Sequence, residues 1–126
     1  MPAIDTNVLV RLVVRDDPDQ TRSAEEFIAG GAWVPLLALA ETVWVLDTVY
    51  GLSPAAIARA TGMLLNHRQL VIQDTDVAGA ALVTFQRRPK LGFSRCLMIE
   101  IARKAGQLPL ATFDRRLASI DGARKI

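Results

Sequence analysis

Short apolar segments alternate with stretches of helical periodicity along the whole chain of 126 residues. Val8-Leu9 and Leu12-Val13 recur at the spacing of one helix face, whereas Leu70-Val71-Ile72 is a brief apolar run that predicts a buried strand. Strands are expected at Pro2–Asp5, Trp33–Pro35, Leu70–Ile72 and Leu108–Phe113, with a candidate edge strand at Ala123–Ile126.

Helices are predicted between these strands. Asp17 before Pro18 is expected to cap a helix that ends at Gly30-Gly31, and Ser94 to cap a helix that runs to Lys104 and closes at Gly106. Strands separated by helices imply a parallel sheet with helices on both faces. The sequence therefore predicts a single α/β domain over residues 1–126, a three-layer α/β/α fold with a short parallel sheet of four to five strands. Its other helices are expected at about 8–13, 37–50, 77–88 and 115–120, with one more opening at Ser53-Pro54.

The composition indicates a packed globule without membrane segments. Apolar residues make up 51% of the chain and charged residues 22%, which argues against disorder. The one cysteine, Cys96, lies in an apolar stretch, so we expect a core residue in a protein of the reducing cytoplasm. The N-terminus has no basic region of a signal peptide, and polar residues interrupt the most apolar run, 34–49.

Charge is unevenly distributed along the chain. Residues 1–86 carry five basic and ten acidic side chains, whereas residues 87–126 carry ten basic and three acidic ones. A basic third of a small domain is the footprint expected for a polyanionic partner. Solvated helix ends would give the same bias, and charge alone favours that simpler explanation.

Three carboxylates have positions that suggest chemistry. Asp5 and Asp114 each follow a predicted strand, and function in parallel sheets gathers beyond the carboxyl ends of the strands. If the two strands are neighbours, both side chains reach one crevice. Glu41 lies in an otherwise apolar helix, where an ionised carboxylate is costly unless it is paired or bound to metal.

A group of carboxylates favours a hard divalent cation. Converging carboxylates repel one another unless a cation compensates, and oxygen ligands suit Mg²⁺ or Mn²⁺. Zinc spacing is absent, because the chain has one histidine and one cysteine far apart. We expect His67, at a helix end, to be exposed or capping. There is no Ser-His-Asp arrangement and no phosphate-binding glycine loop. Acidic residues beside a basic surface fit the hydrolysis of a phosphodiester.

Four segments of the chain, in order, resemble the PIN domain, and in particular the VapC-type toxins of bacterial toxin–antitoxin pairs. They are Ile4–Leu9, Ala40-Glu41-Thr42, Gly92–Met98 and Leu110–Leu117. The resemblance implies that Asp5, Glu41 and Asp114 are three of four acids that bind metal and cut RNA, and that Asn7 and Thr112 orient them. It also implies an antitoxin partner and a homodimer.

Arg95 departs from this family pattern, in which an aspartate usually precedes the small-apolar-apolar run. An arginine there changes the local charge by two units and introduces a planar fork that can pair with Asp5 or Asp114. The guanidinium would then take the place and the charge of the cation. We therefore expect a normal fold with weak metal binding and little or no nuclease activity. Glu100 is not expected to substitute, because it points to another side of the helix.

Two other classes of protein are considered beside the nuclease. In a phospho-acceptor receiver domain, Asp74, Thr112 and Lys125 could act as the functional residues, but Thr6 stands where a second acid is needed and Glu41 is left without a role. An aspartyl phosphatase would need an acid where Asn7 stands. The stronger alternative is a non-catalytic protein of the same fold, disarmed by Arg95, that binds an antitoxin or RNA.

Overall fold

Every strand of this protein is three residues long, and helices separate the strands along the chain. The computed structural model describes all residues from Met1 to Ile126. It contains seven α-helices and four short strands, and every strand pair is parallel, which confirms the predicted α/β class. No helix has the length and apolar character needed to cross a bilayer. The chain divides into two compact units, residues 1–75 and 76–126.

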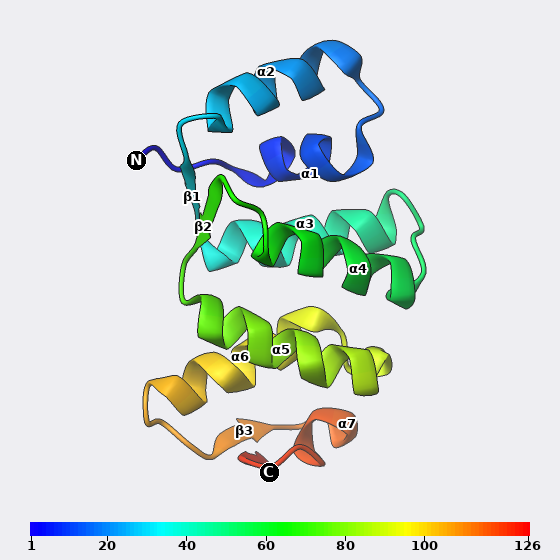
Figure 1. Ribbon diagram of the computed structural model, residues 1–126. Helices are drawn as coiled ribbons and strands as arrows, with labels where there is room; N and C mark the ends of the chain where they lie inside the picture. Colours follow the sequence, from blue (N-terminus) through cyan, green and yellow to red (C-terminus); the bar gives the residue numbers. More distant parts are fainter. The chain divides into compact units, whose positions relative to one another are not determined.

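The unit of residues 1–75 is built on a small parallel sheet (Figure 1). The strand β1 leads into α3. The helix α1 packs against both α2 and α3, and α3 packs against α4. Asp17 caps α2 through a hydrogen bond from Gln20 N, as the sequence predicts. Ser53 caps α4 through a hydrogen bond from Ala56 N, at the helix start predicted at Ser53-Pro54. The elements are α1 (Thr6–Val14), α2 (Pro18–Ile28), β1 (Ala32–Val34), α3 (Leu36–Thr48), α4 (Pro54–Leu65) and β2 (Leu70–Ile72).

The strand predicted at Pro2–Asp5 is reduced to one bridge. Ala3 pairs with Trp33 of β1, whose other side pairs with β2 from Ala32–Leu70 to Val34–Ile72. Proline has no N–H to donate, so Pro2 contributes only its carbonyl, which accepts from Trp33 N at 2.8 Å. Asp5 comes two residues after this bridge and is the N-cap of α1.

The unit of residues 76–126 contains a second parallel pair. β3 and β4 pair from Leu110–Ala123 to Thr112–Lys125, so the strand pairs form two separate ladders where the sequence predicted one sheet. β3 begins later than predicted, because Pro109 cannot donate a ladder hydrogen bond. The elements are α5 (Thr75–Arg87), whose first residue belongs to the other unit, the 3₁₀ turn η1 (Pro89–Leu91), α6 (Phe93–Lys104), β3 (Leu110–Thr112), α7 (Arg115–Ala118) and β4 (Ala123–Lys125).

The predicted cap at Ser94 is wrong. α6 begins at Phe93, and its N-cap is Gly92, which has φ +82° and gives no side-chain hydrogen bond. A side chain at that φ would be strained, so the chain enters α6 through a glycine. The early start buries Phe93, whose ring meets that of Phe85 edge to face with 6.0 Å between centroids.

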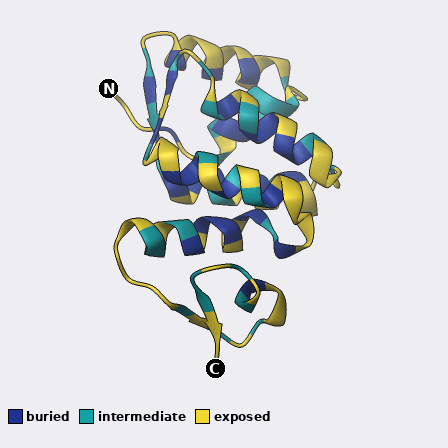
Figure 2. Cartoon of the chain, turned by 60° about the horizontal axis from the view of Figure 1, so that its bottom comes forward, coloured by how far each residue is buried: buried dark blue, intermediate teal, exposed yellow.

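Burial follows one face of each helix (Figure 2). Thr42 and Thr61 are the fully buried polar side chains of residues 1–75, and each donates its hydroxyl proton to the carbonyl four residues earlier, at 2.7 and 2.8 Å. Cys96 is buried as predicted, and burial raises the pKa of its thiol. A thiol of that kind is an inert core group.

Two leucines of α3 give a matched test of this core. Leu39 is 0% exposed and Leu37 is 70% exposed, on the same helix and two residues apart. We predict that Leu39→Ala lowers the free energy of unfolding by about 2–5 kcal/mol, because it leaves a cavity. Leu37→Ala should change it by less than about 0.5 kcal/mol. Urea denaturation of both variants checks this, and equal losses would contradict the assigned burial.

Candidate functional site

Asp5 is held at the start of α1 by the helix that it caps. Its backbone is extended, with φ −96° and ψ −178°, and its Oδ1 accepts a hydrogen bond from Val8 N at 3.2 Å. The side chain is exposed, and no protein donor contacts its second oxygen. The unpaired N–H groups of a helix start favour a negative charge there. Asp5 therefore presents one fixed, charged oxygen to solvent.

Glu41 is joined to the same helix start through Thr6. Thr6 Oγ1 donates to Glu41 Oε2 at 2.7 Å, across the packed pair α1 and α3. Two of the three predicted carboxylates are therefore linked through Thr6, which follows Asp5 in the chain and hydrogen-bonds to Glu41. Thr6 was not predicted as a site residue. Its position directly after Asp5 was the only sequence signal that could have revealed it.

The expectation that Glu41 is a costly carboxylate among apolar neighbours is wrong. Leu37, Glu41 and Trp44 occupy one face of α3, and all three are exposed. The buried face of α3 is instead formed by residues such as Leu39 and Leu46. An apolar sequence around a helix does not bury every side of it. Glu41 is thus accessible to cations and ligands, and a functional role for it cannot be argued from the cost of burying a carboxylate.

Asp114 repeats the arrangement of Asp5 in the other unit. It caps α7, accepting from Leu117 N at 2.8 Å, and its own N–H donates to Thr112 Oγ1 at 3.0 Å. The Leu117 N–H is the main cause that holds the pKa of Asp114 below its usual value, and the charge of Arg95 acts in the same direction. Thr112 thus fixes the backbone of the residue that carries the carboxylate.

Arg95 lies beside Asp114. Its Nε is 3.6 Å from Asp114 Oδ2, and one terminal nitrogen donates to Leu91 O at 3.3 Å. Of the two partners expected from the sequence, Asp5 and Asp114, the structure shows Asp114. The distance is that of an ion pair through one nitrogen, without the two parallel hydrogen bonds of a bidentate pair. Arg95 nevertheless brings a positive charge against a predicted metal ligand.

Asn7 makes no hydrogen bond to either carboxylate of its unit. It is exposed on α1 and borders a hollow between α1 and α2, together with Phe27. The orienting role that the resemblance implies for Asn7 is therefore not visible as a contact, in contrast to that of Thr112.

The donor set fits a hard cation in kind. Asp5 and Glu41 each keep an oxygen without a protein partner, and carboxylate oxygen is the ligand that Mg²⁺ prefers. No group of three or more histidine, cysteine, aspartate or glutamate side chains comes together in a metal-binding arrangement. At Asp114 the guanidinium of Arg95 competes with a cation.

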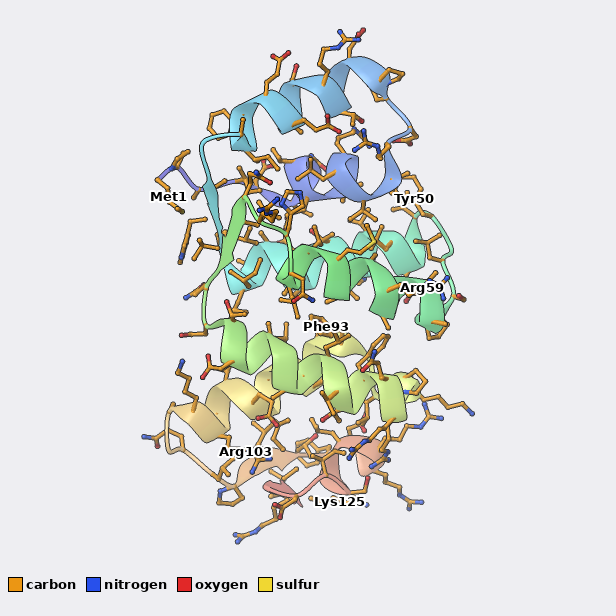
Figure 3. All side chains as sticks on the ribbon, in the orientation of Figure 1. Met1, Tyr50, Arg59, Phe93, Arg103 and Lys125 are labelled. Carbon is orange, nitrogen blue, oxygen red and sulfur yellow. The ribbon has the colours of Figure 1, made fainter.

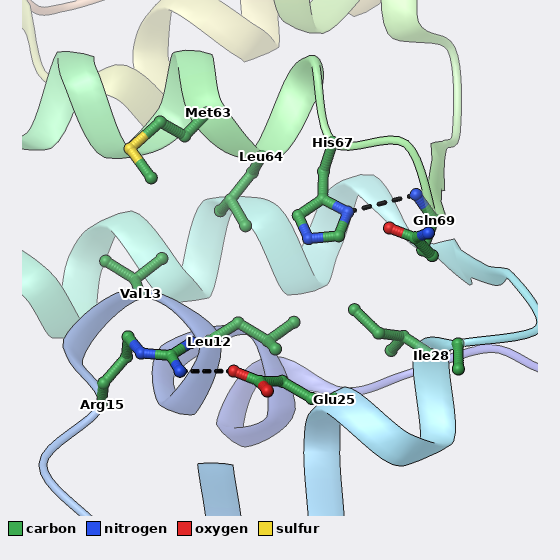
Figure 4. Close-up of a pocket in the computed structure, with 10 residues that line it drawn as sticks. Leu12, Val13, Arg15, Glu25, Ile28, Met63, Leu64, His67 and Gln69 are labelled. Carbon is green, nitrogen blue, oxygen red and sulfur yellow. Dashed lines mark hydrogen bonds and ion pairs between the residues drawn. The ribbon is translucent and has the colours of Figure 1, made fainter. Parts of the chain in front are cut away.

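A second hollow in residues 1–75, here called the His67 hollow, lies away from the predicted site residues. It measures about 440 Å³ and is bordered by Leu12, Met63 and the ion pair of Arg15 with Glu25 (Figure 4). His67 is half-buried there, and its Nδ1 accepts from Gln69 N at 3.1 Å. His67 does not cap α4, whose C-cap is Asn66; its hydrogen bond is made within the loop that leads to β2.

A family model for the PIN domain matches residues 3–123. The chain belongs to the PIN-domain family. The match covers nearly the whole chain and extends over both compact units. PIN domains are generally metal-dependent ribonucleases and generally bind Mg²⁺. This membership replaces the receiver-domain and phosphatase alternatives. No curated protein and no solved structure matches the chain.

The ion pair of this PIN domain predicts a pKa change. Arg95→Gln should raise the pKa of Asp114 toward its usual value, while the Leu117 N–H still holds it lower. A depressed carboxyl pKa stabilises the fold above the unfolded-state pKa and loses that effect as the pH falls through the folded-state value, so the variant should lose it at higher pH. Titration of the side-chain carbon resonances by NMR measures the shift.

Lys104→Gln is the matched control for that titration. Lys104 donates to Asp76 at 3.0 Å and is the main cause of the lowered pKa of Asp76. Its removal should raise the pKa of Asp76 and leave Asp114 unchanged. An unchanged or lower pKa of Asp114 in Arg95→Gln would contradict the assigned ion pair.

Proposed function

We propose that this chain is a VapC-type endoribonuclease toxin whose activity is suppressed by Arg95. The observation that carries the proposal is the Arg95–Asp114 ion pair, in a chain of a family of metal-dependent ribonucleases. The proposed catalytic and metal-binding residues are Asp5, Glu41 and Asp114. Asn7 and Thr112 are proposed as supporting polar residues.

RNA is supported as the substrate by the charge of the second unit. Residues 76–126 carry ten basic and four acidic side chains, a net charge of +6. All of the basic side chains are exposed except Arg103, which is half-exposed, so they are available to phosphates. Figure 3 shows Arg103 and Lys125 among the side chains of this unit. Arginine and lysine contacts to the backbone would bind RNA without regard to sequence.

The chain's own residues would position the reaction. When bound, Mg²⁺ or Mn²⁺ would supply charge stabilisation at the phosphate and activation of a water molecule. In both Asp5 and Asp114, one carboxylate oxygen accepts the cap hydrogen bond, and this bond fixes the direction of the second oxygen. Glu41 would be oriented by the Thr6 hydroxyl. These contacts reduce the motion that a ligand would have to overcome on binding.

Arg95 opposes this arrangement by its charge. An aspartate at that position would add a negative charge to the group, whereas Arg95 adds a positive one next to Asp114. A cation would be repelled by the guanidinium and would have to displace it from Asp114. Weak metal affinity is the expected consequence, and with it little or no cleavage.

The same ion pair supports a second candidate function. A PIN domain whose ligand position is taken by an arginine could keep the fold and bind a partner without cutting RNA. We propose a cognate antitoxin and a second copy of the chain as partners, from the resemblance to VapC toxins. Exposed large apolar side chains, among them Leu37, Trp44 and Phe113, support the existence of protein contacts.

Arg95→Asp tests the proposed function. We predict that it raises Mg²⁺-dependent cleavage of single-stranded RNA by more than about 100-fold, because a lost ligand should cost at least as much as a lost outer-shell partner. Arg59→Asp makes the same change of charge at an exposed position of α4 that has no recorded partner, and it should stay inert. Calorimetry with Mg²⁺ should show tighter binding in Arg95→Asp alone.

A further substitution assigns the cleavage to the proposed residues. Asp5→Asn placed in the Arg95→Asp chain should abolish cutting while the fold is kept, because asparagine caps a helix as well as aspartate does. If Arg95→Asp stays inert at high Mg²⁺, the binding protein is the better description. If the native chain binds Mg²⁺ tightly and cuts RNA in an Asp5-dependent way, suppression by Arg95 is wrong.

A further inference from the structure

The faces of α1 and α2 that meet within residues 1–75 enclose a hollow of about 290 Å³, here called the α1–α2 hollow. The α2 side is a regular helix face, with residues at positions i, i+3, i+4 and i+7, and the α1 side adds three more. Its borders are formed by Asn7, Val8, Arg11, Gln20, Ser23, Ala24 and Phe27.

An exposed aromatic ring forms one side of this hollow. Phe27 is 54% exposed, although α2 buries its neighbours Ala24 and Ile28. A single exposed phenylalanine has no special meaning by itself. Here the ring stands against polar side chains, so it offers a flat apolar surface next to hydrogen-bonding groups.

The polar groups around Phe27 are held in place yet keep unused capacity. Arg11 donates to Asp16 at 3.1 Å, to Tyr50 at 3.2 Å and to the amide oxygen of Gln20, which fixes the guanidinium and leaves the NH₂ group of Gln20 available. Neither the Asn7 amide nor the Ser23 hydroxyl has a recorded hydrogen-bond partner. The hollow therefore presents both donors and acceptors.

A nucleobase matches this combination better than a peptide or an apolar molecule does. A base is planar, stacks on aromatic rings and carries donors and acceptors at its edge. The volume lies at the lower end of the roughly 300–1,000 Å³ of ligand pockets, which suits one base.

The α1 residues that border the hollow follow directly after the Asp5 cap in the sequence. Val8 donates its N–H to Asp5 Oδ1 at 3.2 Å, and its side chain borders the hollow. Asn7 is the residue between Thr6, which contacts Glu41, and Val8. The first two turns of α1 thus carry both the Asp5 and Thr6 contacts and one border of the hollow, although neither carboxylate borders it.

The geometry points to the α1–α2 hollow as a pocket for one base of single-stranded RNA, stacked on Phe27 and read by Asn7, Gln20 and Ser23, an inference that rests on the proposed ribonuclease function. It makes Phe27 a base-binding residue apart from the proposed catalytic carboxylates. The basic residues of the second unit would act on phosphates and not on bases.

Binding in EDTA tests the pocket without any cleavage. The probe is a fluorescein-labelled eight-nucleotide RNA of mixed sequence, and an abasic chain of the same length serves as the comparison. Fluorescence anisotropy should show that Phe27→Ala weakens RNA binding about 5- to 10-fold, the lower end of what one stacked base contributes. Binding of the abasic chain should not change.

Two variants control this measurement. Phe27→Trp keeps a stacking ring and should retain affinity, which separates stacking from a general effect of substitution. Met63→Ala truncates a 69% exposed side chain at the His67 hollow and should leave RNA binding unchanged. Circular dichroism of each variant checks the fold, and the exposure of Phe27 makes its truncation tolerable.

The outcomes separate this inference from the proposed function. Equal RNA affinity of the native chain and Phe27→Ala, equal losses for RNA and the abasic chain, or no RNA binding at all would overturn the pocket. If Arg95→Asp cuts RNA but Phe27 has no effect, only the pocket is wrong. If nothing cuts RNA but binding depends on Phe27, the nuclease is wrong and the pocket stands.

Discussion

Helix capping by strand-end carboxylates is the constraint on which the rest of this structure depends. Asp5 and Asp114 each leave an extended segment and accept a hydrogen bond from the third residue of the next helix, Val8 or Leu117. The bond satisfies a helix N–H that would otherwise be unpaired, and it also fixes the direction in which the other oxygen points. Two of the proposed metal ligands are therefore also helix caps, which is why Asp5→Asn is more informative than removal of the side chain.

The charge at Arg95 sets this PIN domain apart from a straightforward metal-dependent ribonuclease. Carboxylates that converge on one another repel, and either a divalent cation or a guanidinium can compensate their charge. Arg95 supplies it permanently at Asp114, through one nitrogen at 3.6 Å. Both side chains are partly exposed, so the pair contributes little to stability and its effect is on what else can bind there. The family match over residues 3–123 fits both an active ribonuclease and a binding protein of the same fold.

Local rules predicted much of the fold, and non-local packing decided what they missed. The cap at Asp17 and the helix start at Ser53-Pro54 depend on a few neighbouring residues and were predicted from them. The Ser94 cap failed because a positive φ at the preceding glycine starts the helix earlier. Sequence could not tell which face of α3 is buried, so Glu41 was expected in the wrong environment. Phe27 was not singled out in the sequence, because an apolar residue at helical spacing is typical of a core position, whereas the structure leaves it 54% exposed.

The central proposal is that Asp5, Glu41 and Asp114 are metal ligands and that Arg95 opposes a cation at Asp114. Mn²⁺ tests this directly, because it broadens the NMR signals of nuclei near it. In the Arg95→Asp chain, low concentrations of Mn²⁺ should broaden the amides of Thr6 and Val8, next to Asp5, and the amide of Leu117, next to Asp114, whereas the native chain should need far more Mn²⁺. Broadening of only one of the two groups, or equal sensitivity of the native chain, would contradict the account.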